Sequence, residues 1–131
     1  MSTIIVAGNL ASDPELRFTP SGRPVARLTV IENRRRRNED GDWEDAEPNA
    51  YRVEAWGSTA ENVAESCQKG DRVLVSGSII TDRWTDKESG SARTAQHINA
   101  DEVAFSLRYH TVQATKARGR QDQGQSEDEQ N

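Results

Sequence analysis

The chain has 131 residues, with 17 basic and 22 acidic side chains and a formal net charge of −5. This length suits one domain with a modest core, and the acidic balance argues against a general polybasic binder of nucleic acid. No stretch approaches the length of a transmembrane helix, and the first residues lack the positive start of a signal peptide. Cys67 is the single cysteine, so no disulfide framework exists and we expect a cytoplasmic protein without membrane association.

Short runs rich in Val and Ile, bounded by Gly, Pro, Asn and Asp, predict an all-β domain. The predicted strands span residues 3–10, 24–33, 50–56, 72–84 and 92–105, and a further run at 106–113 is a candidate edge strand. The composition changes near the C-terminus, where RGRQDQGQSEDEQN contains no apolar residue. We therefore expect one domain over residues 1–113 and a disordered polar, acidic tail over residues 114–131.

One segment changes from strand to helix periodicity. Ser58 and Glu61 have the spacing of a capping box, and Gly70 supplies a stop signal. Between them the apolar residues repeat at helical spacing: Ala60, Val63, Ala64 and Cys67. A single short helix between the third and fourth of five strands is the layout of an OB-fold, a partly open Greek-key barrel. From the pattern alone, other small barrels remain an alternative.

Residues that could carry catalysis or hold a metal are sparse. His97 and His110 lie in strand-like runs, without a Cys or a second His at ligand spacing. Cys67 lies on the apolar stripe of the helix, so we expect it to pack as a small hydrophobe. The sequence contains no phosphate-binding glycine loop followed by Lys-Ser or Lys-Thr. We therefore expect no enzyme activity, no cofactor and no metal.

The three tryptophans stand among charged residues. Alternation along the predicted strand 50–56 places Trp56 on the same face as Arg52. Trp84 lies at the tip of a long strand, and Trp43 lies in an acidic loop. The alternative for each ring is packing in the core. Exposed rings interleaved with guanidinium groups suit the stacking of unpaired bases, while the arginines hold phosphates.

A block of four arginines, Arg34, Arg35, Arg36 and Arg37, closes the predicted second strand and enters a loop of about a dozen residues. Such a long hairpin arm can reach around a strand of nucleic acid, with the arginines at its base and Trp43 near its tip. The alternative is a solvated hairpin in which the arginines pair with acids of the same segment: Glu39, Asp40, Asp42 and Glu44.

Three stretches, GNLASDPELRFTPSGRPVARLTV, WGSTAENVAESCQKGDRVLVSGSI and the RW of TDRWTD, resemble bacterial single-stranded DNA-binding protein, over roughly residues 1–112. The motifs are long and keep their order along the chain, so the resemblance is specific. It implies an OB-fold homotetramer that wraps and protects single-stranded DNA without sequence preference. It also implies a cytoplasmic, nucleoid-associated protein that serves replication, recombination, repair or chromosome maintenance.

The resemblance also implies roles for individual residues. The stacking aromatics fall on Trp56 and Trp84, and phosphate contacts fall on Arg52, Lys69 and Arg83. The arginine block lies in the hairpin arm that the family uses against DNA.

Two further positions correspond to contacts between subunits. Tyr51 falls where the family makes such contacts, and SLRYHTV, which contains Tyr109, resembles the extra strand with which actinobacterial members brace their tetramers.

The chain departs from the family pattern at two places. Ala50 stands where many relatives place a further stacking aromatic. The tail ends SEDEQN, with acids but without the hydrophobic tip that recruits repair and replication enzymes. We therefore expect weak or no recruitment through the tail, as in the short-tailed second copy that some bacteria carry.

Two other classes of function remain as alternatives. One is an assembly module that binds other proteins, and the other is an enzyme subunit. A DNA binder differs from the assembly module in that its affinity for single-stranded DNA falls steeply as salt rises.

Overall fold

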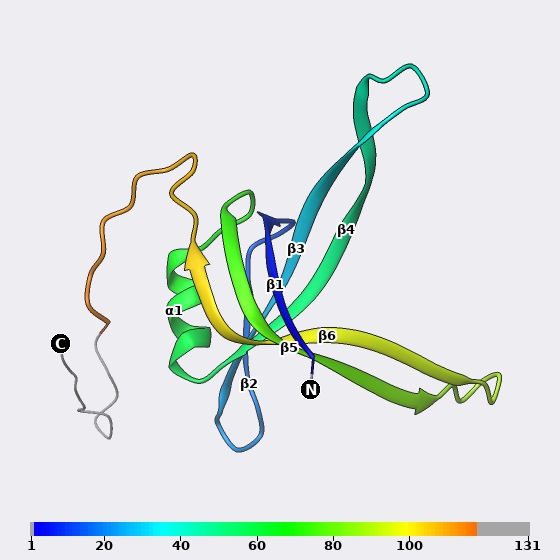
Figure 1. The fold of residues 1–131 in the computed structure, drawn as a ribbon. Helices are drawn as coiled ribbons and strands as arrows, with labels where there is room; N and C mark the ends of the chain where they lie inside the picture. Colours follow the sequence, from blue (N-terminus) through cyan, green and yellow to red (C-terminus); the bar gives the residue numbers. More distant parts are fainter. Residues whose placement is uncertain (1, 118–131) are drawn as a thin grey trace.

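Six strands and one helix follow one another along residues 2–117, the part of the chain that the computed structural model describes (Figure 1). They are β1 (Thr3–Leu10), β2 (Glu15–Phe18), β3 (Pro24–Arg37), β4 (Trp43–Trp56), α1 (Ser58–Ser66), β5 (Arg72–Thr85) and β6 (Ala92–Phe105). The sequence predicts all of them except β2, whose four residues are too few to show an alternating pattern. β2 pairs with the first residues of β3 in a short hairpin.

The strands close into a barrel. They lie in the order β1-β5-β6-β4-β3-β2, and the end of β1 also pairs with β3, which joins the two sides of the sheet. Glycine is required where strands approach closely: a Cβ at Gly8 would lie 2.3 Å from the Ile31 carbonyl oxygen, and one at Gly77 2.2 Å from that of Asn99. With α1 between β4 and β5, this arrangement confirms the predicted OB-fold.

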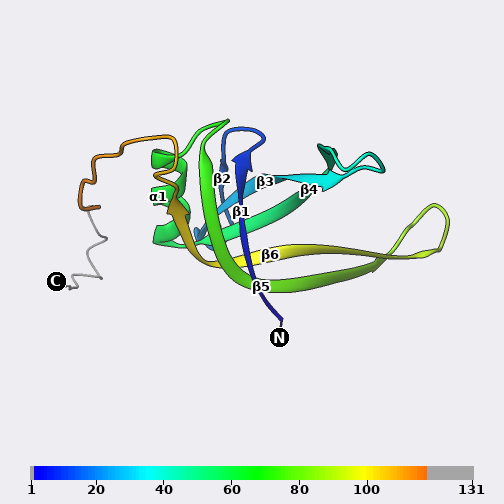
Figure 2. The ribbon, with the colours of Figure 1, turned by 45° about the horizontal axis from the view of Figure 1, so that its top comes forward.

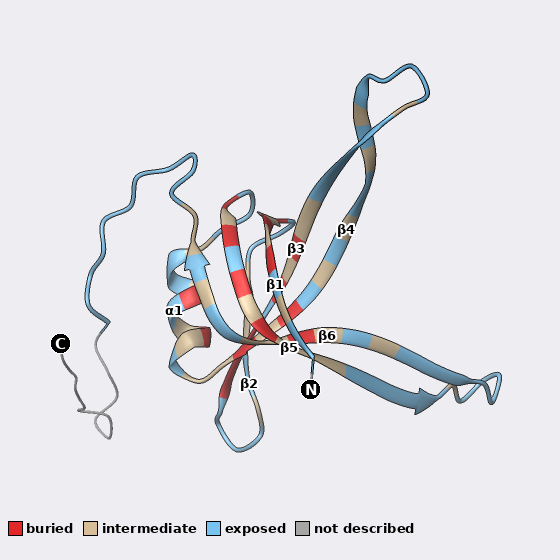
Figure 3. Cartoon of the chain, viewed as in Figure 1, coloured by how far each residue is buried: buried red, intermediate tan, exposed pale blue. Residues whose placement is uncertain are grey.

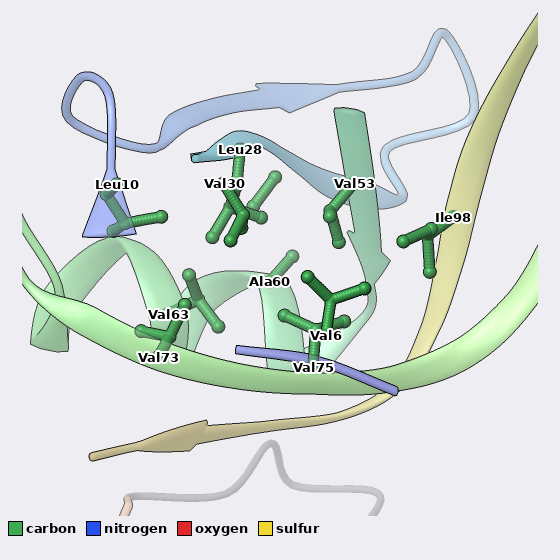
Figure 4. Close-up of a cluster of buried hydrophobic side chains, with 11 residues drawn as sticks. Val6, Leu10, Leu28, Val30, Val53, Ala60, Val63, Val73, Val75 and Ile98 are labelled. Atoms are coloured by element: carbon green, nitrogen blue, oxygen red, sulfur yellow. The ribbon is translucent and has the colours of Figure 1, made fainter. Parts of the chain in front are cut away.

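The core fills the barrel with small aliphatic side chains. Alternate residues of the strands point inward, as Figure 4 shows for the labelled cluster, and the largest fully buried ones are Val30, Val53, Val73 and Val75. Burial is confined to this region, while the distal halves of the long strands are exposed or intermediate (Figure 3). The protein therefore consists of a small dry barrel from which two hairpin arms project (Figures 1 and 2).

The helix α1 covers one end of the barrel, and it confirms most of the predicted apolar stripe, of which Ala64 is only partly buried. Ala60 and Val63 are buried in the core, and Cys67 packs against it. The predicted capping box is wrong. The N-cap is Gly57, one residue earlier than expected, and no side chain caps the helix. The first helical N–H groups of Ala60 and Glu61 instead point to the Gly57 carbonyl.

Two expectations about the ends of strands are also wrong. The predicted loop of about a dozen residues after the arginine block is mostly ladder, because β3 runs on to Arg37 and β4 begins at Trp43. The candidate edge strand at 106–113 forms no strand in this chain, because after Ser106 donates to the Arg72 carbonyl the chain leaves the sheet. Most of the expected tail, residues 118–131, lies outside the described residues.

Candidate nucleic-acid interface

The outer face of β4 carries the residues that the sequence places on it. Val53 and Ala55 are buried, whereas Arg52 is exposed and Trp56 is half-buried on the opposite side of the strand. The predicted alternation is confirmed. Tyr51 shares the inner face, where its ring packs against the core and its hydroxyl donates to Glu32 Oε1 at 3.4 Å.

A polar groove of about 430 Å³ runs over this outer face. Its lining includes side chains from four strands: Arg27, Thr29, Arg52, Glu54, Asp82 and His97. The arginines of β3 and β4 reach it from neighbouring strands in register, because Thr29 pairs with Arg52 and Arg27 with Glu54. The groove is therefore an extended surface along the sheet and not an enclosed site for a small molecule.

The groove contains its own charge network. His97 Nδ1 lies 2.9 Å from Asp82 Oδ2, and its Nε2 lies 3.4 Å from Glu54 Oε1. Arg27 Nε lies 3.5 Å from Glu54 Oε2, and Arg52 donates to the Gln96 carbonyl at 3.4 Å. The sequence predicts that His97 is a surface residue or one whose ring nitrogens have hydrogen-bond partners, and the two carboxylates confirm this. Arg27 was not singled out, because only the pairing of β3 with β4 brings it beside Arg52.

A bulge in β4 determines which arginines share a face with the groove. From Glu32 to Arg34 the register advances two residues on β3 but three on β4, from Asn49 to Ala46. The extra residue lies around Pro48, which has no N–H to contribute to the ladder and is well suited to a bulge. Beyond this point the faces of β4 are exchanged relative to the rest of the strand.

The arginine block is consequently divided between the two faces of the β3–β4 arm. Arg35 and Arg37 continue the outer face of Thr29, and they lie opposite Asp45 and Trp43. Arg34 and Arg36 lie on the other face, opposite Ala46 and Glu44. Without the bulge, Trp43 and Trp56 would point to opposite sides of β4. The sequence gives no direct signal of this division, because four consecutive identical residues carry no alternation.

Part of the block is paired with acids of the same arm. Arg36 Nε lies 3.0 Å from Glu44 Oε2 and Arg35 Nε lies 3.9 Å from Asp45 Oδ1. Arg37 donates to the Gly41 carbonyl at 3.0 and 3.2 Å and lies over the Trp43 ring. The alternative of a self-paired hairpin therefore holds in part. Within residues 2–117, the other three acids proposed for it form no ion pair: Glu39, Asp40 and Asp42.

The β5–β6 arm carries the second exposed tryptophan. Trp84 is 50% exposed and lies directly opposite Arg93, which is held by Asp86 at 3.2 Å. Arg83 points to the other face of the arm, opposite Thr94. Since Trp43 is also 59% exposed, packing in the core accounts for neither ring. The sequence does not single out Arg93, because only the pairing of β5 with β6 places it opposite Trp84.

The remaining predicted residues lie away from the arms. Lys69 is exposed in the turn before β5, and its N–H donates to Asp13 Oδ1 at 2.8 Å, so it lies beside a residue of the groove lining. Trp56 lies at the end of β4 with the Arg23 guanidinium carbon 4.5 Å from its ring centroid. Tyr109 is 68% exposed in the segment that follows β6.

The rest of the described chain offers little for catalysis. Burial, and next the Asp71 carboxylate, raise the pKa of the Cys67 thiol, so the reactive thiolate is disfavoured. Residues 2–117 contain no cluster of three or more His, Cys, Asp and Glu side chains that could hold a metal. Nor does any helix in that range have the length and apolar character to cross a bilayer.

Comparison with known proteins agrees with a binding surface. The sequence profile of the "Single-strand binding protein family" matches residues 1–106. The single-stranded DNA-binding protein of Mycolicibacterium smegmatis is 44% identical over 117 residues, covering 88% of this chain and 70% of that protein. Single-stranded DNA-binding protein 2 of Streptomyces coelicolor is 43% identical over 119 residues, covering 90% and 59%.

A solved structure gives the same result. The small single-stranded DNA-binding protein of Streptomyces coelicolor has a TM-score of 0.65 and 28% identity, covering 81% of this chain and 94% of that one. The barrel, its open polar groove and its two arms define an OB-fold protein with an extended binding surface. The chain belongs to the single-strand binding protein family.

Proposed function

We propose that the protein binds and protects single-stranded DNA without sequence preference. The observation that carries the proposal is the continuous outer surface from Trp56 and Arg52 along the β3–β4 arm to Trp43, together with the exposed Trp84 on the β5–β6 arm. Flat rings stack on any base, and guanidinium groups between them contact the backbone, so such a surface reads no sequence. The resemblance and the family membership support the same conclusion.

Binding is assigned to residues 1–113, with named contributions. Trp56, Trp84 and Trp43 stack bases. The phosphates are held by the basic residues: Arg34, Arg35, Arg36, Arg37, Arg52, Lys69 and Arg83. Arg83 and Trp84 point to opposite faces of their arm, so a single strand that contacts both must pass over its edge.

The test is a titration with oligo-dT at two salt concentrations, followed by quenching of tryptophan emission. We expect strong quenching and an affinity that falls steeply with salt, because phosphate contacts release counterions. Duplex of the same length is the control, and it should bind far more weakly because its bases are already stacked. Equal affinity for both forms, or affinity insensitive to salt, contradicts the proposal and favours an assembly module.

We further propose that the active form is a homotetramer. Residues 3–8 of β1 pair only with β5, so one edge of this strand has no partner among the described residues. Ile5 and Leu74 are 67% and 41% exposed on the outer face of β1 and β5, which suits burial against another copy. Tyr51 and Tyr109 are assigned to further subunit contacts.

Light scattering at micromolar concentration tests the assembly. A tetramer mass is expected for the native chain, and Ile5→Glu should reduce it, because a charge would be buried in the apolar contact. Lys87→Glu, which changes an exposed side chain in the turn between β5 and β6, outside the assigned contacts, is the control and should leave the mass unchanged. A monomer mass for the native chain removes the roles assigned to Tyr51 and Tyr109.

Residues 114–131 are assigned no part in DNA binding and little in recruitment. The last three of their four acids are Glu127, Asp128 and Glu129, and no apolar side chain follows them in this sequence. Exposed charge pairs contribute only about 0–1 kcal/mol, whereas a buried apolar side chain contributes about 1.5–3 kcal/mol. Pull-downs with the full chain and with residues 1–113 should therefore recover the same proteins. Repair or replication enzymes that disappear on truncation would contradict this assignment.

We also propose a location in the cell. Because it is proposed to bind single-stranded DNA, we place the protein in the cytoplasm, on the nucleoid.

A further inference from the structure

One arginine outside the predicted set lies against a predicted stacking ring. The Arg23 guanidinium carbon is 4.5 Å from the Trp56 ring centroid, within the range of a cation–π contact. This is the shortest arginine–aromatic distance among the described residues, since Arg37 lies 5.7 Å from Trp43 and Arg108 lies 5.4 Å from Tyr109.

The backbone holds Arg23 in this position. In the turn between β2 and β3, the Arg23 N–H donates to Thr19 Oγ1 at 3.1 Å, and the Thr19 N–H donates to the Arg23 carbonyl at 2.9 Å. The neighbouring residues are tied to the Trp56 end of β4, because Gly57 N–H donates to the Pro24 carbonyl at 3.0 Å. Two short segments far apart in sequence thus fix the base of both side chains.

The charge of Arg23 is not neutralised by the protein. Among residues 2–117 no acid pairs with it, in contrast to Arg35 and Arg36, which pair with Asp45 and Glu44. Arg23 is exposed while the Trp56 ring is half-buried. Its planar guanidinium therefore presents a face to solvent and N–H donors at its rim. These are the two features that stack on a base and contact a phosphate.

We propose that Arg23 is a further DNA-contact residue that forms a two-layer platform with Trp56. The guanidinium lies on the ring, extends the stacking surface for a base, and directs its N–H groups to the adjacent phosphate. This inference rests on the proposed function and adds a residue from the β2–β3 hairpin to the surface. A sequence pattern cannot reveal it, since 32 intervening positions separate the two side chains.

The test measures the anisotropy of a labelled oligo-dT, because a change at Arg23 alters Trp56 emission directly. Arg23→Ala should weaken binding about tenfold, which corresponds to the loss of one stacked group. Arg23→Lys should keep the salt dependence of the native protein but recover only part of the affinity, since it retains the charge without the plane. Arg17→Ala is the matched control: Arg17 lies in the same hairpin, bound to Glu15 at 2.6 Å, and its loss should leave affinity unchanged.

Coupling with the ring completes the test. The double variant Arg23→Ala/Trp56→Ala should bind clearly better than the product of the two single losses predicts, because each change already disrupts the same platform. Losses that simply multiply overturn the two-layer platform, and an Arg23→Ala variant that binds as well as or better than the native protein overturns the assignment of Arg23 to DNA. Circular dichroism on each variant verifies that the fold is intact. If the native protein itself does not bind oligo-dT, the proposed function fails instead.

Discussion

The two hairpin arms are built from strands of equal length but present their functional groups differently. The four strands involved each have 14 residues, and both arms extend beyond the buried part of the barrel (Figure 3). On the β3–β4 arm, Arg35 and Arg36 are already paired with acids, and Arg37 lies over Trp43. On the β5–β6 arm, Trp84 has no ring or guanidinium contact among the described residues.

The comparison shows that not all four arginines of the block are available to bind phosphate, because two of them are paired with acids. A phosphate that approaches the β3–β4 arm must compete with Glu44 and Asp45 for guanidinium groups, so part of the attraction is offset. A base that approaches Trp84 displaces only water from the exposed part of the ring. We therefore expect the second arm to contribute more affinity per residue than the first, although the first carries more basic side chains.

The largest expected effect is that of Trp84→Ala. It should weaken oligo-dT binding by about 1–3 kcal/mol, because it removes a freely accessible stacking plane. Trp43→Ala is the comparison on the other arm. It should cost less because Arg37, whose N–H groups already donate to the Gly41 carbonyl, lies over that ring. Both rings are exposed, so the thermal midpoints should hardly change. A larger loss for Trp43→Ala would reverse the ranking of the arms.

The next effect divides the arginine block by face. Arg35→Ala/Arg37→Ala removes the pair on the outer face, and Arg34→Ala/Arg36→Ala removes the same charge from the opposite face. The slope of log affinity against log salt should flatten by about 0.7 for each phosphate that is no longer neutralised, and thus by up to about 1.4 for the first pair. The second pair should change it less. Equal slopes for the two variants would show that DNA binds against both faces of the arm.

A smaller effect is expected when an internal competitor is removed. Glu44→Gln breaks the 3.0 Å ion pair with Arg36 and releases its guanidinium. Binding should tighten by at most about 1 kcal/mol, since partly exposed ion pairs are weak. Glu39→Gln removes the same charge from the same arm without breaking an ion pair, and serves as control. If both variants tighten binding equally, only the net charge matters and the pairing on the arm is irrelevant.

The smallest effect is the pH dependence of the turn between β5 and β6. Hydrogen bonds from the Glu88 N–H and then the Ser89 hydroxyl lower the pKa of Asp86. A lowered carboxyl pKa contributes stability above the ordinary value, about 3.9, and loses it as pH falls through the lower folded value. Amide exchange in the 86–91 turn should therefore keep the same protection from pH 7 to 5. Loss of protection already within that range would show that Asp86 does not hold the turn.

The sequence predicts the position of a residue best where that position depends on one strand or one helix alone. Alternation alone places Val53 in the core and Trp56 outside it, because successive side chains of a strand point to opposite faces. The apolar stripe of α1 is equally local. The extent of the β3–β4 arm was not predicted, since charged residues have low strand propensity and only cross-strand pairing holds Arg35 and Arg36 in the ladder.

Features that depend on distant segments escape a reading of the sequence. Only strand pairing places Arg93 opposite Trp84 and Arg27 in the same groove as Arg52, and only a turn places Arg23 over Trp56. The capping box failed for a different reason. Its spacing is present in the sequence, but α1 starts one residue earlier, so Ser58 stands inside the helix instead of before it.

The bulge around Pro48 limits how insertions and deletions can change the β3–β4 arm. One residue inserted or deleted on β4 between the bulge and Trp43 would turn this ring to the opposite face. An arm that lengthens and keeps its arrangement must add two residues to each strand, a step of about 7 Å. Changes within the turn between Arg37 and Trp43 leave both faces as they are. Across lineages, the turn between β3 and β4 is therefore free to vary in length by single residues. The paired part of the arm is expected to change in length only by two residues on each strand.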